Sequence, residues 1–160
     1  MLAPVGWQDR EALRALKADP GSFALMLGGV RTTAQADAEL AEDLRFWSAH
    51  GVGMWTVRAP GDDRLLGITG LHDRPDGRGV ALRFAFWPEM RGRGLAREAA
   101  GAALRFAHDR AGMARVIAIA RESNVASRVV LGAIGMREHD AFERGGERVL
   151  IYESGKPDPA

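Results

Sequence analysis

The stretch Phe84-Ala-Phe-Trp-Pro-Glu-Met-Arg91-Gly92-Arg93-Gly94-Leu95-Ala96-Arg97-Glu98 joins an apolar run to a glycine-rich basic turn and an alanine-rich helical pattern. Glycines at 92 and 94 allow a sharp turn and let an anion approach main-chain N–H groups without interference from a Cβ. The helix that begins there adds unpaired N–H donors and the positive end of its dipole. Arg91, Arg93 and Arg97 add charge around the turn, and a guanidinium binds phosphate through two donors. The stretch therefore predicts a phosphate or pyrophosphate site on a strand–turn–helix unit.

The residues around this turn exclude two other glycine motifs. A dinucleotide-binding fingerprint would need a third glycine where Arg97 stands. A Walker loop would need Gly-Lys followed by Ser or Thr, which the turn lacks. A solvated Arg-Gly segment that binds single-stranded nucleic acid is the remaining alternative, and it predicts strongly salt-dependent affinity. The motif occurs once, between an apolar strand and a helix, which favours the anion site.

The composition is typical of one soluble globular domain. The chain has 160 residues, of which 46% are hydrophobic and 27% are charged. We expect a single domain over residues 1–153 and a flexible tail over residues 154–160. The 22 basic and 21 acidic residues give a net charge of +1, which argues against an electrostatic nucleic-acid binder.

The absence of cysteine excludes disulfides, thiolate metal sites and thiol nucleophiles. The histidines, at positions 50, 72, 108 and 139, show no metal-ligand spacing, so we expect no metal. No apolar run is long enough to span a membrane, and the first residues lack the pattern of a signal peptide. We therefore expect a cytoplasmic protein without a membrane partner.

Hydrophobic periodicity and turn residues predict an α+β fold with mixed α/β layers. A loop is expected after Asp19-Pro20-Gly21, and Thr33 is the expected N-cap of the second helix. The strand over 114–120 is expected beside the strand over 80–87. The expected helices cover 8–18, 33–50, 95–110 and 124–134, and the expected strands cover 52–59, 65–71, 80–87, 114–120 and the two segments that flank Gly145-Gly146.

Several motifs follow one another in an order typical of one enzyme family. Arg91-x-x-Gly94-x-Ala96 fits a pyrophosphate motif, and Asn124-Val-Ala-Ser127 precedes a helix that ends at Gly135-Met136. Upstream, Gly67-Ile-Thr-Gly-Leu71 follows an approach over residues 47–57. Together they resemble the Gcn5-related N-acetyltransferase (GNAT) superfamily, in particular the branch similar to bacterial ribosomal-protein N-terminal (alanine) acetyltransferases. The resemblance runs over residues 7–152, nearly the whole chain.

The resemblance implies a GNAT-like fold, with a splayed, mixed, mostly antiparallel sheet flanked by helices. Acetyl-coenzyme A would lie beside the strand over 80–87 as a surrogate strand, with its pantetheine amides paired to main-chain groups near Phe84 and Phe86. Its pyrophosphate would sit on the N–H groups of residues 92–97, and Asn124 would contact the cofactor from the neighbouring element. The implied cofactor-binding residues are Phe84, Ala85, Phe86, Arg91, Gly92, Arg93, Gly94, Leu95, Ala96, Arg97 and Asn124.

The implied reaction is direct acetyl transfer to a primary amine in a ternary complex, without a metal. A protein N-terminal amine is the acceptor that the resemblance favours, and a small amine such as an antibiotic or a polyamine is the alternative. The loops over 19–35 and 138–147 have no acidic excess, which favours a peptide or a neutral amine. A non-catalytic acyl-coenzyme A sensor is a rival, and the protein would be a monomer or a homodimer.

The expected general acid departs from the family pattern. Many members of the superfamily carry a tyrosine where this chain has Leu131, and Tyr152 is an unlikely substitute in the last expected strand. Ser127 is the candidate acid, directly or through water, because the closer branch often has serine there. The alternative interpretation of Ser127 is a helix N-terminal hydroxyl bonded to the backbone.

The expected general base is also missing. Relatives commonly have a glutamate early in the strand where this chain has Val80-Ala81-Leu82-Arg83. Among the groups near the strand ends, which also include Asp73 and Glu89, His72 is the best candidate because it accepts a proton at neutral pH without a large pKa shift. A water chain or a substrate amine of low pKa is the alternative. Arg83 either pairs with Glu122 or points into the acceptor side.

The N-terminal segment Met1-Leu-Ala-Pro-Val5 differs from its counterpart in relatives, which usually begin with a longer strand. Two interpretations remain open. The first strand is shortened, or the start codon has been placed late.

Overall fold

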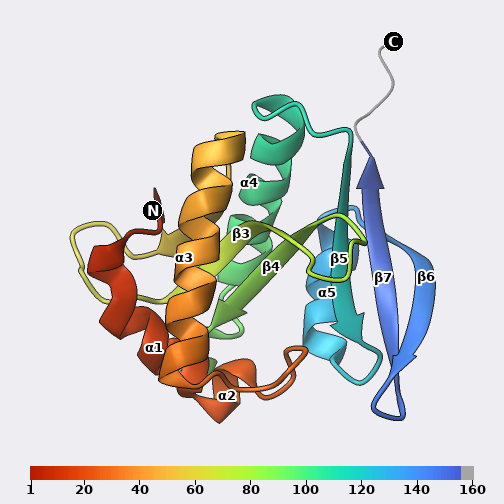
Figure 1. Cartoon of the computed structure of the whole chain (residues 1–160), viewed down its shortest axis with the longest axis horizontal. Helices are drawn as coiled ribbons and strands as arrows, with labels where there is room; N and C mark the ends of the chain where they lie inside the picture. The colour runs from red at the N-terminus through yellow and green to blue at the C-terminus, as the bar shows by residue number, and fades with distance from the viewer. Residues whose placement is uncertain (156–160) are drawn as a thin grey trace.

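The computed structural model describes residues 1–155, which form one seven-stranded sheet flanked by helices (Figure 1). The strand order is β1-β2-β3-β4-β5-β7-β6, and every neighbouring pair is antiparallel except β4 with β5. The strands are β1 Leu2–Pro4, β2 Met54–Val57, β3 Gly67–Asp73, β4 Val80–Phe86, β5 Arg115–Arg121, β6 Arg137–Arg144 and β7 Glu147–Gly155. The helices are η1 Trp7–Asp9, α1 Arg10–Ala18, α2 Pro20–Phe23, α3 Thr33–His50, η2 Pro88–Met90, α4 Leu95–Asp109 and α5 Val125–Ala133.

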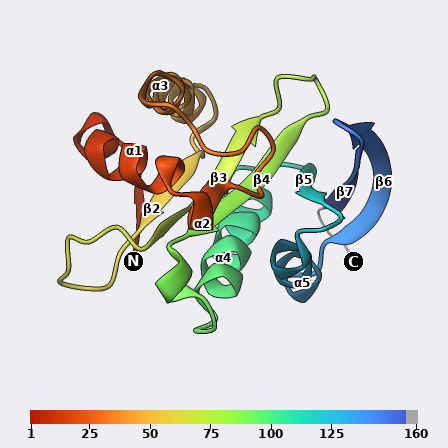
Figure 2. The same cartoon turned by 90° about the horizontal axis from the view of Figure 1, so that it is seen from below.

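The helices form two layers, one on each face of the sheet (Figure 2). On one face, α1, α2 and α3 bury Leu16, Phe23 and Leu40 against apolar side chains of β2, β3 and β4. On the other face, the small residues of α4 allow close packing on the sheet, and Ala100 and Ala103 are fully buried there. These two apolar layers account for the α+β fold expected from the sequence, which is confirmed.

The strands β4 and β5 stay together over only a short distance. They pair at Ala81 with Ile117 and at Leu82 with Ala118, although β4 continues to Phe86 and β5 to Arg121. Each strand is paired over seven positions on its other side, β4 with β3 and β5 with β7. The sheet therefore opens beside residues 83–86, and β5 lies next to β4 as expected from the sequence.

The two glycines of the basic turn adopt left-handed backbone conformations. The φ angle is 77° at Gly92 and 74° at Gly94, and Gly94 is the N-cap of α4. An L side chain is strained in this region of φ, so the sharp passage from η2 into α4 depends on glycine. This turn lies at the end of the opening between β4 and β5.

Several boundaries differ from the sequence expectation. The helix α2 was not predicted, because four residues carry no periodic signal. The strand β1 is short, as in the first of the two interpretations of the N-terminal segment. The strand β7 runs to Gly155, beyond the expected end of the domain at residue 153, since Ser154 pairs with Val116 and Gly155 with Arg115. The rest of the expected tail, residues 156–160, lies outside the described residues.

The N-cap of α3 is Thr32, which corrects the expected Thr33. The Thr32 hydroxyl oxygen accepts from the Gln35 N–H at 3.1 Å, and the Gln35 side chain accepts from the Thr32 N–H at 2.9 Å. This reciprocal capping box places Thr33 inside the first turn, where its side chain has no capping role.

We expect Thr32→Ala to lower the free energy of unfolding by about 1 kcal/mol, because an N–H at the start of α3 loses its acceptor. Thr33→Ala is the matched control, and it should change the stability by less than half as much, since alanine is a better helix former. Urea denaturation of both variants measures the difference. A larger loss for Thr33→Ala would place the N-cap one residue later.

Candidate functional site

Two cavities lie along the β4–β5 opening, and they adjoin each other. The first has a volume of about 500 Å³ and lies between α2, the glycine turn and the start of α5. The second has a volume of about 680 Å³ and lies between α3, β3, β4 and β5. The first cavity is lined by Pro20, Gly21, Ser22, Leu25, Met26, Phe84, Ala85, Phe86, Met90, Arg91, Gly92, Gly94, Leu95, Ala96, Arg97, Asn124, Ala126, Ser127, Val129 and Val130.

The glycine turn supplies main-chain donors to the first cavity. The first helical hydrogen bond of α4 runs from the Glu98 N–H to the Gly94 carbonyl, so the N–H groups of residues 95–97 have no acceptor in the preceding backbone. A Cβ added at Gly92 or Gly94 would meet no atom within 4 Å, so the space above the turn is open. Unpaired donors at a helix N-terminus beside open space form a site suited to an anion.

The arginines of the turn occupy three different positions. Arg91 lines the first cavity and donates from its guanidinium to the Gly21 carbonyl, which joins the turn to α2. Arg97 also lines this cavity, on the first turn of α4. Arg93 is exposed and does not line it. Ten of the eleven expected cofactor-binding residues, all except Arg93, therefore lie around one cavity.

The two cavities share a small set of residues where they join. Ser127 and Asn124 stand at the start of α5, and Phe84 stands on β4 two residues after Leu82, the last residue paired with β5. Asn124 is the N-cap of α5, and its Oδ1 accepts from the Ser127 N–H at 3.3 Å. The Ser127 hydroxyl makes no hydrogen bond within residues 1–155, so the backbone-bonded interpretation finds no support there.

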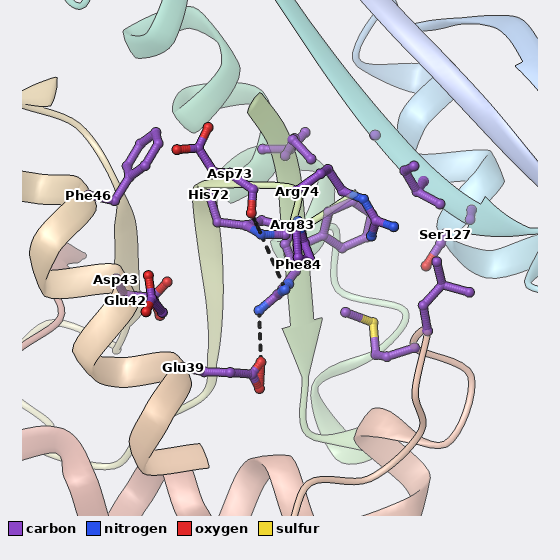
Figure 3. Close-up of a pocket in the computed structure, with 18 of the residues that line it drawn as sticks. Glu39, Glu42, Asp43, Phe46, His72, Asp73, Arg74, Arg83, Phe84 and Ser127 are labelled. Atoms are coloured by element: carbon purple, nitrogen blue, oxygen red, sulfur yellow. Dashed lines mark hydrogen bonds and ion pairs between the residues drawn. The ribbon is translucent and has the colours of Figure 1, made fainter. Parts of the chain in front are cut away.

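The second cavity has a charged wall on the side of α3 (Figure 3). Its lining combines guanidinium groups from several elements with carboxylates from α3 and β3. The charged and titratable lining residues are Arg31, Glu39, Glu42, Asp43, Arg45, His50, His72, Asp73, Arg74, Arg83, Arg121 and Arg144. No group of three or more His, Asp or Glu side chains within residues 1–155 is arranged to hold a metal ion.

Glu39 is the anion at the centre of this wall. Its carboxylate lies 2.8 Å from Arg31 Nε, 3.3 Å from Arg83 Nη1 and 3.7 Å from Lys17 Nζ. Burial alone would raise the pKa of Glu39, but Lys17, Arg83 and Arg31 together lower it below its usual value. Glu39 therefore stays ionised and offsets part of the positive charge of these three cations.

Lys17 and Asp43, near Glu39, are also buried, and burial opposes the charged form of each. Lys17 is 1% exposed, and burial lowers the pKa of its ammonium group. Asp43 is 6% exposed, and burial raises the pKa of its carboxyl group to about 6, against the opposing charges of Lys17 and Arg83. Asp43 lines the second cavity one helical turn after Glu39, and the sequence analysis did not identify it.

His72 lies on β3 in the second cavity and faces Arg83 (Figure 3). Its Nδ1 is 3.3 Å from Arg83 Nη2 and 3.2 Å from the Asp73 carbonyl oxygen. Burial lowers the pKa of His72 well below its ordinary value, and the positive charges of Arg83 and Arg74 lower it further. The imidazole is therefore neutral at pH 7, and it holds an added proton poorly.

The remaining expectations have clear outcomes. Arg83 pairs with Glu39 and lines the second cavity, whereas Glu122 pairs with Arg148. Tyr152 is buried away from both cavities, and its hydroxyl lies 3.2 Å from Arg128 Nε and 3.3 Å from Glu138 Oε1. No helix within residues 1–155 has the length and apolar character that crossing a membrane requires.

The sequence and the fold are similar to those of known acetyltransferases. Residues 1–137 match the family described as acetyltransferase (GNAT) domain. An acetyltransferase from Agrobacterium tumefaciens has the same fold, with a TM-score of 0.83 at 23% identity over 96% of this chain and 88% of that chain. A ribosomal L7/L12 α-N-protein acetyltransferase in complex with coenzyme A gives a TM-score of 0.76 at 14% identity over 96% and 92%. A spermidine N-acetyltransferase variant from Vibrio cholerae gives 0.74 at 14% identity over 98% and 95%.

We expect Asp43→Asn to stabilise the protein at neutral pH. The pKa of Asp43 in the folded state, about 6, is above the unfolded value of 3.8, so its contribution to stability is present below pH 4 and is lost as the pH rises through 6. The variant should therefore match the wild type near pH 4 and exceed its free energy of unfolding by up to about 3 kcal/mol at pH 7. Urea denaturation at both pH values measures this difference.

Asp37→Asn is the matched control for this effect. Asp37 lies on the same helix, but Arg14 Nη2 contacts its carboxylate at 2.6 Å, and this hydrogen bond lowers the pKa of Asp37. The same substitution there removes a favourable ion pair, so it should not stabilise the protein at pH 7. Equal effects of the two substitutions would contradict the assignment of the Asp43 shift to burial.

Proposed function

Because this chain belongs to the acetyltransferase (GNAT) domain family, we propose that it transfers acetyl from acetyl-coenzyme A to a primary amine, in particular a protein N-terminal amine. The observation that carries the proposal is the meeting of two cavities at Phe84 and Ser127, one ending in unpaired helix N–H donors and the other lined by titratable groups. Such a pair of cavities holds two substrates so that their reacting groups meet.

The donor cavity fits an extended molecule that carries phosphates. Main-chain groups of residues 83–86 that face β5 have no partner strand, and a chain of amides such as pantetheine supplies the missing hydrogen bonds. The N–H groups of Leu95, Ala96 and Arg97 lie at the far end, where a pyrophosphate would bind. From the junction of the two cavities outward, unpaired main-chain groups come first and the N–H donors of α4 come second. Acetyl-coenzyme A carries its amides and its phosphates in the same order.

Ser127 is our proposed proton donor to the leaving thiolate, directly or through water. Its side chain stands where the two cavities join, and its hydroxyl is free of other hydrogen bonds within the described chain. The reaction itself is a direct attack of the unprotonated amine on the thioester carbonyl. The protein supplies proximity and proton transfer for this step.

The charge of the second cavity favours a peptide amine over a polyamine. Six arginines line it against four carboxylates, and Glu39 is already neutralised by cations. The excess of guanidinium groups in the lining suits the carbonyl and carboxylate oxygens of a peptide. A polyamine would place several positive charges among these guanidinium groups, which is unfavourable.

We expect Gly94→Leu to abolish measurable binding of coenzyme A, because a side chain there would fill the open space above the N–H donors. Gly61→Leu is the matched control, since Gly61 has a φ of 76° with no atom near its Cβ position and lies outside both cavities. Calorimetric titration should show the wild-type dissociation constant for Gly61→Leu. Unchanged affinity of Gly94→Leu would contradict the anion site at this turn.

The function is tested by the release of free thiol from acetyl-coenzyme A with a panel of amines. We expect short peptides with a free N-terminus to give kcat/KM values at least tenfold above that of spermidine, because of the arginine-rich lining. Mass spectrometry of the peptide should locate the acetyl group on the α-amine. Binding of acetyl-coenzyme A without transfer to any amine would favour the sensor alternative instead.

A further inference from the structure

Asp43 is a buried carboxylate that the fold does not use. It lies on α3 with a side chain that reaches the second cavity, opposite His72 and Arg83 (Figure 3). It is 6% exposed, and the ion pairs of Lys17 and Arg83, the opposite charges that lower its pKa, go to Glu39, so that within residues 1–155 no hydrogen bond and no ion pair of 4 Å or less involves the Asp43 carboxylate. Buried carboxylates are normally paired, because an unpaired buried charge is costly. A group that remains unpaired beside a cavity is therefore available to a ligand.

The other carboxylates of the cavity wall are committed or solvated. Glu39 contacts three cations, which hold it in the ionised form. Glu42 is exposed and pairs with Arg45, and Asp73 is exposed at the end of β3. Asp43 alone among these four combines burial with a free carboxylate.

The proton affinity of Asp43 is set by charges on three elements. Lys17 on α1 and Arg83 on β4 lower its pKa, while burial, Glu39 and Glu42 raise it, with a result of about 6. His72 faces the same space from β3, but its imidazole is neutral at pH 7 because burial and Arg83 lower its pKa. Asp43 is thus ionised at neutral pH and accepts a proton far more readily than an exposed aspartate.

We propose that Asp43 is the catalytic residue that receives the ammonium group of the acceptor and takes its proton. The proposal rests on the acetyltransferase function proposed above, since it names the base of that reaction. The base is then a residue of α3, since β4 begins Val80-Ala81-Leu82-Arg83 and offers no carboxylate there.

The step conserves atoms and charge. One N–H bond of the ammonium breaks, its proton binds the Asp43 carboxylate, and the nitrogen lone pair is released. This lone pair forms the new C–N bond at the thioester carbonyl as the C–S bond breaks, and the nitrogen then loses a second N–H proton, which replaces the one that Ser127 or water gives to the leaving thiolate. The thiolate leaves with a proton from Ser127 or water, and Asp43 returns its proton to solvent through the open cavity.

The test compares the pH dependence of peptide acetylation by the wild type and two variants. We expect kcat at pH 7 to fall at least 100-fold in Asp43→Asn, while the peptide KM changes less than tenfold. The wild-type kcat/KM should decrease below pH 6, and this acidic limb should disappear in Asp43→Asn but persist in His72→Gln. Carbon NMR of the wild-type carboxyl groups should show one aspartate that titrates near pH 6 and is absent from Asp43→Asn.

Asp37→Asn is the control, because it makes the same change on the same helix outside both cavities. Its kcat should stay within threefold of the wild type. Calorimetry should show that Asp43→Asn still binds acetyl-coenzyme A, and urea denaturation should show that it is folded. These measurements separate a lost proton acceptor from a lost fold or a lost donor site.

Four results would overturn the assignment. A higher KM with an unchanged kcat would reduce Asp43 to an ammonium-binding group. An acidic limb that is lost in His72→Gln but kept in Asp43→Asn would make His72 the base. Wild-type protein that transfers acetyl to no primary amine would overturn the proposed function together with this role, whereas an active wild type with an equally active Asp43→Asn would overturn this role alone.

Discussion

The two-residue contact between β4 and β5 is the constraint on which the site depends. Ala81 pairs with Ile117 and Leu82 with Ala118, and beyond these pairs each strand is hydrogen bonded only on its far side. Main-chain groups cannot remain unpaired in a dry interior, so the inner edges must face water or a ligand with amides of its own. The opening therefore creates both cavities, and it brings Phe84 on β4 close to Ser127 on α5.

The glycine turn and the charged wall of α3 lie at opposite sides of this opening. They differ in the source of their electrostatic field, which is the main chain at the turn and buried side-chain ions at the wall. At the turn, main-chain N–H groups attract a negative charge without any buried ion of the protein. On the wall, the protein buries its own ions, and the Glu39 carboxylate contacts Lys17, Arg31 and Arg83. Burial of Asp43 outweighs the attraction of Lys17 and Arg83, so its ionised form reduces stability. Functional sites often carry such a cost.

Much of the fold and of the donor side could be predicted from local sequence. The periodic segments gave the long helices and the central strands, and the Arg91–Arg97 segment indicated the anion site because glycine conformation and helix termini act over a few residues. The N-cap of α3 was placed one residue late, since Thr32 and Thr33 are adjacent and only Gln35 in the observed geometry distinguishes them. The helix α2 was missed because it is too short for a periodic signal.

The acceptor side was decided by tertiary structure. In the sequence, Glu39 and Asp43 form one more i, i+4 pair of acidic residues on an amphipathic helix, a pattern typical of a solvated face. Lys17 and Arg83 are 22 and 44 positions away from Glu39 along the chain. Folding buries both of them beside this face of α3, which therefore becomes a cavity wall. Sequence alone thus determined the glycine turn at the start of α4, because its physics is local. Only the packed structure decided which carboxylate is neutralised and which is free, because desolvation and ion pairing depend on groups brought together by folding.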